Sequence, residues 1–574
     1  MNHADPSVLP PKPASAVAPT EQSQQTHTVT LFTANAVRAT GGILGNTVAV
    51  ADGKVVAIGD LATLREAHPS ATIHSYEGAT ITAGLIDGHA HPAWGTMMAR
   101  GVGLQKCETY DQVVDAIKKQ AQITPDNEWV FAWGLEPHMI GGTVTNDFLH
   151  DALGPDRPAY VACFDAHSAV MSAAALREAG INEPQDMSDG GGFTAREDST
   201  LTGHVLEFMA MNRADRGVPP LSIDEFADRL GALLDDFAAN GITAACVADA
   251  QGGDRVIEVL QELENRGELP IQLRISPWCT PDLTEEDVRN LAASLQPATA
   301  PSGRRWRFEG VKMFIDGTID NGTAWLDTPD TMGDGLRGFW QDPATYTRNL
   351  NILNEAHVPT ITHAIGEAGV RHVAQSIAAL PDRGVLHRMD HLETIDDETI
   401  DLIAEHRIPV CVQPTHCTLF VRPDGADSWS ERLGPARRAE GYKIRTFVER
   451  GIVEALGSDW PVAPYDPRAI MADSRLRHRH DGGEAPISPG QVLSAQQVLT
   501  GYTAAVTASI GAPGGDLRVG EPADMTIWSA DPVAASAEEL PGIDILDTVI
   551  GGTVVEPITA GADNNAKKLQ TAGD

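Results

Sequence analysis

The feature that most restricts the fold is an alternation of short apolar runs with helical stretches through the middle of the chain. Several runs are continuously apolar, as expected for strands buried on both faces of a parallel sheet. Strands that alternate with helices form βα units, and eight of them close a TIM-like (β/α)8 barrel, whose reactive groups lie at the carboxyl ends of the strands. The eight predicted strands are Ile81–Asp87, Ile242–Ala248, Gln272–Ser276, Val311–Asp316, Thr360–Ala364, Leu386–His391, Val410–Gln413 and Glu454–Asp459.

Short β runs also occupy both ends of the chain. Asp52-Gly53 separates two of them, and Gly551-Gly552 separates two others, and both dipeptides favour hairpin turns. We therefore predict an α/β chain in which both ends together form a small β-sandwich. The barrel is inserted between the two parts of this β-sandwich along the sequence. The predicted parts are a disordered tail at 1–26, the first part of the β-sandwich at 27–80, the (β/α)8 barrel at 81–505, the second part of the β-sandwich at 506–560 and a second disordered tail at 561–574.

The interval between the first two barrel strands is too long for one helix. It contains two more strand-like runs, Trp129–Trp133 and Ala159–Phe164, a turn at Gly190–Gly192 and a helical pattern over Ile223–Asn240. We expect about residues 95–235 to form an insertion over the mouth of the barrel, where it would shape the substrate site.

The charge of the chain excludes several classes of partner. A formal net charge of -37 repels phosphate backbones and anionic lipid surfaces, so neither nucleic acid nor membrane is expected as a partner. No apolar run approaches the ~20 residues of a membrane span, and the N-terminal stretch has no apolar signal region. The cysteines are scattered without a CxxC pair, which favours a reducing compartment. We predict a cytoplasmic protein.

The first predicted barrel strand ends in two histidines, His89 and His91. Side chains two residues apart on a strand point to the same side, so both imidazoles would converge on one point. Converging imidazoles suit a divalent metal ion, whereas the alternative is a pair of solvated loop histidines.

The ends of the other strands decide between these alternatives. Residues of metal-ligand type, or a lysine, stand at Lys312, His363, His391 and Asp459, all near predicted strand ends. The chain thus supplies the remaining ligands, and the sequence predicts a metal centre at the mouth of the barrel.

Lys312 is unusual because it stands in an apolar strand. Burial lowers the pKa of an amine, and a neutral amine can react with CO₂ to give a carbamate that bridges two metal ions. The alternative is a lysine paired with Asp316 or Glu309.

Asp459 is the candidate base. A carboxylate at the metal can bind the ion and take the proton of the attacking water, and the metal would lower the pKa of that water toward ~7 and polarise a substrate carbonyl. The alternative is an aspartate that caps the following turn. The predicted catalytic residues are Asp459, Lys312 and His363.

These segments resemble the amidohydrolase superfamily, and within it the amidohydrolase family 3 branch that includes N-substituted formamide deformylases. The likeness spans about residues 28–555. It departs from the family pattern at Glu367-Ala368-Gly369, where Asp-Arg-Ala is common, and at Met389-Asp390-His391, where Ile-Glu-His is usual. The motifs that carry the likeness are Ile81–Pro92, Val311–Gly317, Thr362–Gly366, Asp390–Glu393, Val412–His416, Gly457–Val462, Gly501–Val506 and Val519–Met525.

The resemblance implies a β-sandwich, a (β/α)8 barrel and a site with one or two divalent ions. Zinc is the most frequent metal, iron and manganese are alternatives, and Lys312 is implied as a carbamylated bridge. A homodimer is a further expectation. The implied metal ligands are His89, His91, Lys312, His363, His391 and Asp459.

Weaker features concern the substrate. His167 follows a strand of the insertion, where the resemblance places a histidine near the substrate, although a hydrogen bond within the insertion is equally consistent. Gln413 and His416 end the seventh strand as candidate polar contacts, and Asp249 ends the second as a candidate support for a ligand. The predicted substrate-binding residues are Trp133, His167, Arg337, Gln413 and Trp460.

The function predicted from these features is hydrolysis of a non-peptide C–N bond in a small amide, N-substituted formamide or cyclic amide. One alternative is a mononuclear-metal deaminase of a heterocyclic amine, whose sites lack a bridging lysine. An alternative of another class is a catalytically inactive barrel that serves as a scaffold.

Overall fold

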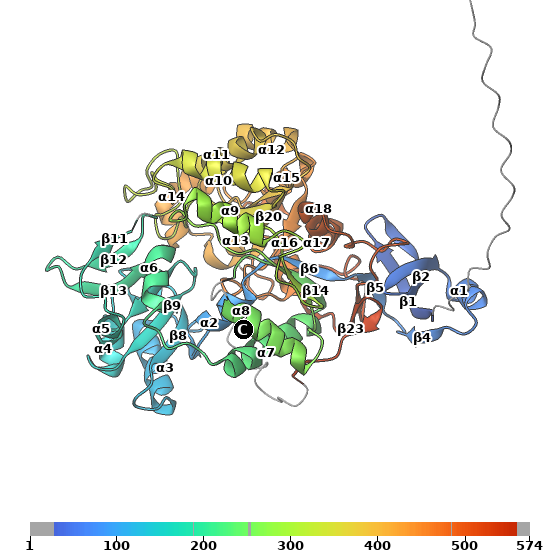
Figure 1. The fold of residues 1–574 in the computed structure, drawn as a ribbon, viewed down its shortest axis with the longest axis horizontal. Helices are drawn as coiled ribbons and strands as arrows, with labels where there is room; N and C mark the ends of the chain where they lie inside the picture. The colour runs from blue at the N-terminus through green and yellow to red at the C-terminus, as the bar shows by residue number, and fades with distance from the viewer. Residues whose placement is uncertain (1–27, 188, 251–253, 484, 560–574) are drawn as a thin grey trace, which may run out of the picture.

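The computed structural model describes residues 28–187, 189–250, 254–483 and 485–559, and both predicted tails lie outside them. The described chain contains one large terminal sheet, a second sheet in the insertion and two parallel sheets between them in space (Figure 1). No helix of the described residues is long and apolar enough to cross a membrane.

Strands from both chain ends form one eight-stranded sheet in the order β24-β23-β22-β5-β1-β2-β3, with β4 paired to β1. The two predicted hairpins are confirmed, since Asp52 (φ 51) and Gly53 (φ 73) turn the chain between β2 and β3, and Gly551 (φ 56) and Gly552 (φ 74) turn it between β23 and β24. The strands are β1 Thr30–Ala39, β2 Gly42–Ala51, β3 Lys54–Gly59, β4 Thr72–Ser75, β5 Thr80–Ala83, β22 Met525–Trp528, β23 Ile545–Ile550 and β24 Thr553–Val554.

The predicted strand Ile81–Asp87 is two strands, not one. Its first half, β5, pairs with β1 and β22 in the terminal sheet, and its second half, β6 (Leu85–Ala90), joins a parallel sheet. Gly84 separates them, and a Cβ there would lie 2.4 Å from the side chain of Thr243. The chain thus crosses from one sheet to the other where only a glycine fits.

The central strands form two parallel sheets, one of four strands in the order β16-β15-β14-β6 and one of five in the order β17-β18-β19-β20-β21. Every predicted strand has a counterpart here, and β16 is an addition. Their bounds are β14 Ile242–Val247, β15 Gln272–Ile275, β16 Trp306–Phe308, β17 Val311–Phe314, β18 Thr360–Ala364, β19 His387–His391, β20 Val410–Val412 and β21 Glu454–Leu456.

Backbone hydrogen bonds join the two parallel sheets on both sides, through the residues after β15 on one side and the ends of β6 and β21 on the other. On one side Lys312 N donates to Pro277 O (2.9 Å) and Cys279 N to Lys312 O (2.8 Å). On the other side Asp459 N donates to His89 O (2.7 Å) and His91 N to Trp460 O (2.8 Å). The second set brings the ends of β6 and β21 together.

Helices follow the parallel strands, as the alternation in the sequence predicts. Several begin with a side-chain cap: Ser222 Oγ accepts from Glu225 N while Glu225 accepts from Ser222 N, which fixes the start of the predicted helix α7. The helices from this region onward are α7 Ile223–Ala239, α8 Asp254–Arg266, α9 Glu285–Ser294, α10 Pro343–Glu355, α11 Glu367–Ala378, α12 Asp397–Glu405, α13 Pro414–Phe420, α14 Ser428–Arg438, α15 Ile444–Glu449, α16 Pro467–Leu476, α17 Ala495–Gly501 and α18 Ala504–Ile510.

The insertion contains a sheet of seven strands in the order β11-β12-β13-β10-β9-β8-β7. The two predicted runs are present as β8 and β9, and the five others are new. In Figure 1 this sheet lies at the opposite end of the molecule from the terminal sheet. The other helices and strands up to α6 are α1 Leu61–Ala67, α2 Pro92–Met98, β7 Val102–Gly103, α3 Tyr110–Ile123, β8 Val130–Leu135, η1 Pro137–Ile140, α4 Asp147–Leu153, β9 Ala159–Cys163, β10 Ser168–Met171, α5 Ala173–Glu178, β11 Gln185–Asp186, β12 Gly192–Ala195, β13 Leu201–Leu206 and α6 Glu207–Asp215.

Candidate metal centre

Five of the six predicted metal ligands lie at or near the carboxyl ends of the parallel strands, Lys312 is the second residue of β17, and all six are buried. They come from β6 and its continuation, from β17, β18 and β19, and from the residues after β21. Their exposed fractions are His89 0%, His91 5%, Lys312 1%, His363 3%, His391 5% and Asp459 6%. Such burial is unusual for ionisable side chains without partners, so their mutual geometry is informative.

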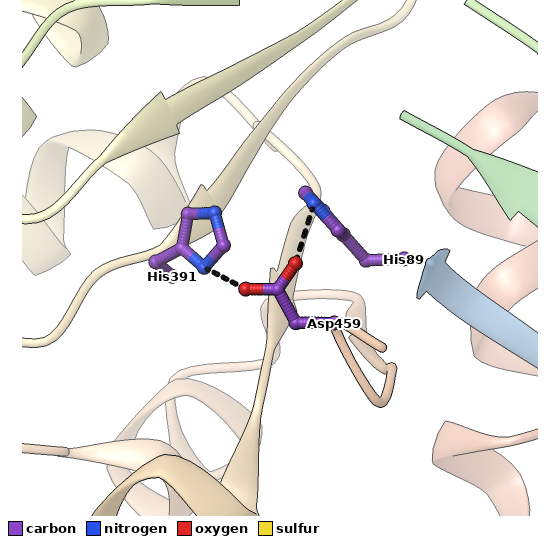
Figure 2. A group of neighbouring side chains, drawn as sticks. All are labelled: His89, His391 and Asp459. Atoms are coloured by element: carbon purple, nitrogen blue, oxygen red, sulfur yellow. Dashed lines mark ion pairs between the residues drawn. The ribbon is translucent and has the colours of Figure 1, made fainter. Parts of the chain in front are cut away.

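His89, His391 and Asp459 form the centre of the group (Figure 2). The carboxylate of Asp459 stands between the two imidazoles, with Oδ1 3.4 Å from His89 Nε2 and Oδ2 3.8 Å from His391 Nδ1. One donor atom from each residue lies within 4.8 Å of the other two. Two nitrogen donors and one carboxylate oxygen match the ligand types of a catalytic metal site.

His391 shows that this group fits a cation. Both of its ring nitrogens are buried, and neither has a hydrogen-bond partner within the described chain. A buried polar atom without a partner costs about 1–3 kcal/mol, so such atoms are rare unless a ligand satisfies them. A metal ion among these three side chains would satisfy one of the two nitrogens.

His91 lies beside the three central residues. Its Nε2 is 3.1 Å from Asp459 Oδ1 and 3.2 Å from His89 Nε2. The sequence prediction that the two histidines converge is therefore confirmed.

Carboxylates behind the histidines orient both rings. His89 Nδ1 lies 2.5 Å from Asp390 Oδ2, and His91 Nδ1 lies 3.2 Å from Asp249 Oδ2. An Nδ1–H that donates to a carboxylate leaves the Nε2 lone pair free to face the cluster. Asp249 thus takes the supporting position predicted for it, whereas the contact of Asp390 was not predicted.

The backbone around the cluster is tightly constrained. A Cβ on Gly457 would lie 2.5 Å from His89 N, so a larger residue would displace the histidine. His391 (φ 79) and Asp459 (φ 61) adopt left-handed backbone conformations, which cost about 1–3 kcal/mol each in a non-glycine residue. The fold therefore holds two of the three central residues in strained backbone conformations.

Lys312 lies next to the cluster. Its Nζ is 3.3 Å from His89 Nε2 and 4.9 Å from the centroid of the Phe314 ring. Burial lowers the pKa of Lys312 to about 8, although the nearby carboxylates of Asp390 and Asp459 oppose that shift. The amine is thus closer to neutrality than an ordinary lysine.

Within the described residues, Lys312 forms no ion pair with Glu309 or Asp316, the two partners of the alternative prediction. Glu309 pairs instead with Arg274, at 2.7 Å. The carboxylate of Asp316 accepts hydrogen bonds from the backbone N–H groups of Ile365 (3.0 Å) and Gly366 (2.8 Å).

His363 is adjacent to His391, with ring centroids 4.4 Å apart, but is outside the three-residue group. Its Nε2 lies 3.2 Å from Gly317 O and donates there, which leaves Nδ1 as its available lone pair. Burial and the neighbouring cations hold the pKa of His363 well below its usual value, so the ring is neutral at pH 7.

The other charges of the cluster also suit metal binding. Burial lowers the pKa of His89 to about 4, and burial keeps the pKa of His391 well below its ordinary value. Burial would raise the pKa of Asp459, but the imidazoles of His89 and His91 hold it below its usual range. Around neutral pH His89 and His391 are therefore neutral and Asp459 is ionised, which are the forms that bind a metal.

Two of the predicted substrate residues lie near the centre. His167 of the insertion has its ring centroid 5.1 Å from that of His363, and its Nδ1 lies 2.8 Å from Glu207 Oε2. Both predicted roles of His167 are thus compatible with its position. Gln413 is buried next to His416, whose Nε2 is 3.4 Å from Asp459 Oδ2.

The remaining three predicted substrate residues lie elsewhere. The ring of Trp460 packs on Gly95 and near Tyr465, Trp133 lies in the core of the molecule, and Arg337 is exposed. Within the described residues, no hydrogen bond, ion pair or ring contact joins these three side chains to the cluster. Their role in substrate binding stays a prediction.

The sequence prediction gave no role to Glu207, and no local pattern marks it, because it stands 40 residues from His167. Asp390 begins the motif Asp390–Glu393, and its place one residue before His391 is the signal that could have identified it.

The buried cluster presents the donor atoms of a metal site between strand ends. An uncharacterised metal-dependent hydrolase from Pyrococcus horikoshii OT3 shares the fold, with a TM-score of 0.67 at 18% identity over 89% of this chain and 99% of that one. The sequence model of the amidohydrolase family matches residues 76–556, and the chain belongs to that family.

Several relatives match nearly the whole chain. The putative amidohydrolase YtcJ of Bacillus subtilis (strain 168) is 26% identical over 88% of this chain and 95% of its own. The N-substituted formamide deformylase of Arthrobacter pascens is 21% identical over 88% of this chain and 94% of its own.

Proposed function

We propose that this protein hydrolyses a non-peptide C–N bond of a small molecule, an amide, an N-substituted formamide or a cyclic amide, with a divalent metal ion at the cluster. The observation that carries the proposal is the buried group of His89, His391 and Asp459, whose donor atoms lie within 4.8 Å of one another. Family membership and the name of the formamide deformylase relative support the type of bond.

Zinc is the proposed metal, because imidazole nitrogens and a carboxylate oxygen are its usual catalytic ligands. Iron and manganese accept similar donors and remain alternatives. His91 and His363 are proposed as further ligands on the two sides of the central group. The amine of Lys312 beside His89 supports a carbamate bridge and a second ion.

When bound, the metal would lower the pKa of a water molecule and polarise the substrate carbonyl. Asp459 is proposed to take the proton of the attacking water and to deliver it to the departing amine. Its carboxylate is ionised and lies among three imidazoles, with Oδ1 3.4 Å from His89 Nε2 and 3.1 Å from His91 Nε2, and Oδ2 3.4 Å from His416 Nε2. An ionised carboxylate close to the attacking water can accept its proton.

The two parallel sheets are proposed to be halves of one closed (β/α)8 barrel. Hydrogen bonds link Lys312 to Pro277 and Cys279 at one seam and link His89 and His91 to the residues after β21 at the other. Closure explains why side chains from five strands meet at one point.

The first test is the metal content of protein purified without added metal, by elemental analysis. About two divalent ions per chain support the bridged pair, and about one supports a mononuclear site in which Lys312 has a lesser role. No bound ion, even after metal is added back, contradicts the proposal and favours the scaffold alternative.

Strand β19 offers a matched pair of variants for this test. His391→Gln removes a ring whose nitrogens have no partner within the described chain, whereas His387→Gln alters a buried ring bonded to Thr360 Oγ1 (2.9 Å) and Asn354 Oδ1 (3.2 Å). We expect His391→Gln to lose metal and turnover and His387→Gln to keep both. Equal metal content in the two variants would contradict the site.

Substrate panels then separate the reaction types. Release of formate or another carboxylate from N-substituted formamides and amides supports the proposal. Release of ammonia from heterocyclic amines, with no hydrolysis of amides, would replace it with the deaminase alternative.

A further inference from the structure

Arg388 is one of the largest fully buried side chains of the protein, with an exposed fraction of 1%. It stands on β19, three residues before His391, on the same strand as a proposed metal ligand. Burying a guanidinium is costly unless its donors are paired, so its partners indicate its role.

The guanidinium of Arg388 donates two parallel hydrogen bonds to the carboxylate of Asp390. Nε donates to Asp390 Oδ1 (2.7 Å) and Nη2 donates to Asp390 Oδ2 (2.9 Å). The second of these oxygens is also 2.5 Å from His89 Nδ1. A two-pronged contact fixes the plane of a carboxylate, which a single charge does not do.

The same guanidinium also holds the backbone that carries His89. Nη2 donates to Gly88 O (2.9 Å), and Nη1 lies 3.4 Å from Ser509 Oγ of α18. Arg388 therefore reaches both the carboxylate that orients the imidazole of His89 and the peptide unit just before it.

We propose that Arg388 is a positioning residue that fixes Asp390 and the Gly88–His89 backbone, so that His89 Nε2 points at the metal and the affinity for metal is high. This inference rests on the metal site of the proposed function, not on the identity of the substrate. Arg388 does not touch the reacting atoms and acts through Asp390 and His89.

The competing explanation is that Arg388 serves only the stability of the buried core. Arg477 provides a matched control, because it is also fully buried (0% exposed) and its Nε donates to Ile487 O at 2.9 Å. No hydrogen bond or ion pair of the described residues connects Arg477 to the proposed ligands.

The test uses full-length protein stripped of metal and measures the Kd for Zn²⁺ by competition with a chromophoric chelator. Arg388→Lys keeps the positive charge but loses the bidentate hydrogen bonds to Asp390. We expect it to bind Zn²⁺ about 10–100-fold more weakly than the wild type. The Co²⁺ absorption spectrum of Arg388→Lys should also change, because the geometry at the metal changes. Arg477→Lys should match the wild type in both measurements.

A second variant tests the proposal in case Arg388→Lys does not fold. Arg388→Met combined with Asp390→Asn removes both buried charges and leaves an amide oxygen to accept from His89 Nδ1. We expect a folded protein, by circular dichroism, whose Zn²⁺ affinity is still at least about 10-fold below that of the wild type.

Unchanged Zn²⁺ affinity in Arg388→Lys, or an equal loss in Arg477→Lys, overturns the inference while the metal site stands. Absence of Zn²⁺ binding by the wild type overturns the metal site and the inference together. Binding of Zn²⁺ that depends on Arg388, in a protein that hydrolyses none of the amides, supports the inference and contradicts only the proposed reaction.

Discussion

Gly88 lies directly before His89 in β6, where neighbouring strands leave no room for a side chain. A Cβ at this position would lie 2.6 Å from Leu456 O and 2.9 Å from Cys411 Sγ, whereas ordinary van der Waals contact begins at 3.4 Å. The nearer atom is a backbone oxygen of β21, which cannot rotate away. In Gly88→Ala the strands must therefore move apart.

Forcing an extra methyl group into a packed interior costs about 1–3 kcal/mol. The displacement should also change metal binding, because His89 Nε2 lies only 3.2 Å from His91 Nε2 and 3.4 Å from Asp459 Oδ1. We therefore predict that Gly88→Ala lowers the free energy of unfolding by about 1–3 kcal/mol and weakens Zn²⁺ binding at least about 10-fold.

The assay is urea unfolding of the metal-free protein, followed by Zn²⁺ titration. Gly59→Ala is the matched control, since Gly59 also stands in a strand, but a Cβ there meets nothing within 4 Å. Gly59→Ala should leave stability unchanged or raise it by a few tenths of a kcal/mol. If Gly88→Ala unfolds at the same urea concentration as Gly59→Ala, the steric reasoning is refuted.

Three further predictions follow from the charges of the site and the core. Asp459→Asn, which tolerates the left-handed backbone, should fold normally and lose turnover by roughly 10³-fold, and full activity in a steady-state assay would exclude Asp459 as the base. Burial opposes protonation of His91, but Asp249 and Asp459 raise its pKa above the ordinary value, so a proton competes with the metal. Zn²⁺ affinity should then fall up to about tenfold per pH unit below that pKa, and an affinity independent of pH from about 8 to 5.5 would contradict this. Burial raises the pKa of Glu454 well above its usual value, so the stability contributed by its neutral form is lost as pH rises through the folded pKa. Glu454→Gln should therefore raise Tm relative to wild type more at about pH 8 than at about pH 5, and an equal difference at both would refute the assignment.

The sequence predicted the strands and the convergence of His89 and His91 because buried parallel strands leave continuous apolar runs with ligand-type residues at their ends. It did not predict the break at Gly84, since a close approach to Thr243 depends on a strand far away in sequence. The sequence also did not predict β13 and its neighbours in the insertion sheet, because these strands are short and their partner strands become known only from the fold.

Arg388 shows another limit of sequence reasoning. Arginine is normally a surface residue, so nothing in the pattern marks one that is fully buried. Its contact with Gly88 O spans 300 residues, and such a contact becomes visible only when the strands are assembled. Conversely, Trp460 is next to Asp459 in sequence, yet its ring packs on Gly95, because adjacent residues of a turn face different sides.

The terminal sheet can be completed only late in the synthesis of the chain. β5 is paired on one side with β1 and on the other with β22. The hydrogen bond from Trp528 to Thr82 can therefore form only after the ribosome has made a residue 446 positions further along the chain. At about 5–20 residues per second the ribosome needs tens of seconds to make that interval. During this time one edge of a strand whose residues are all buried in the finished protein has no partner strand. A chain released before β22 is made would carry the residues of the metal centre but would leave this edge open to pairing with other chains.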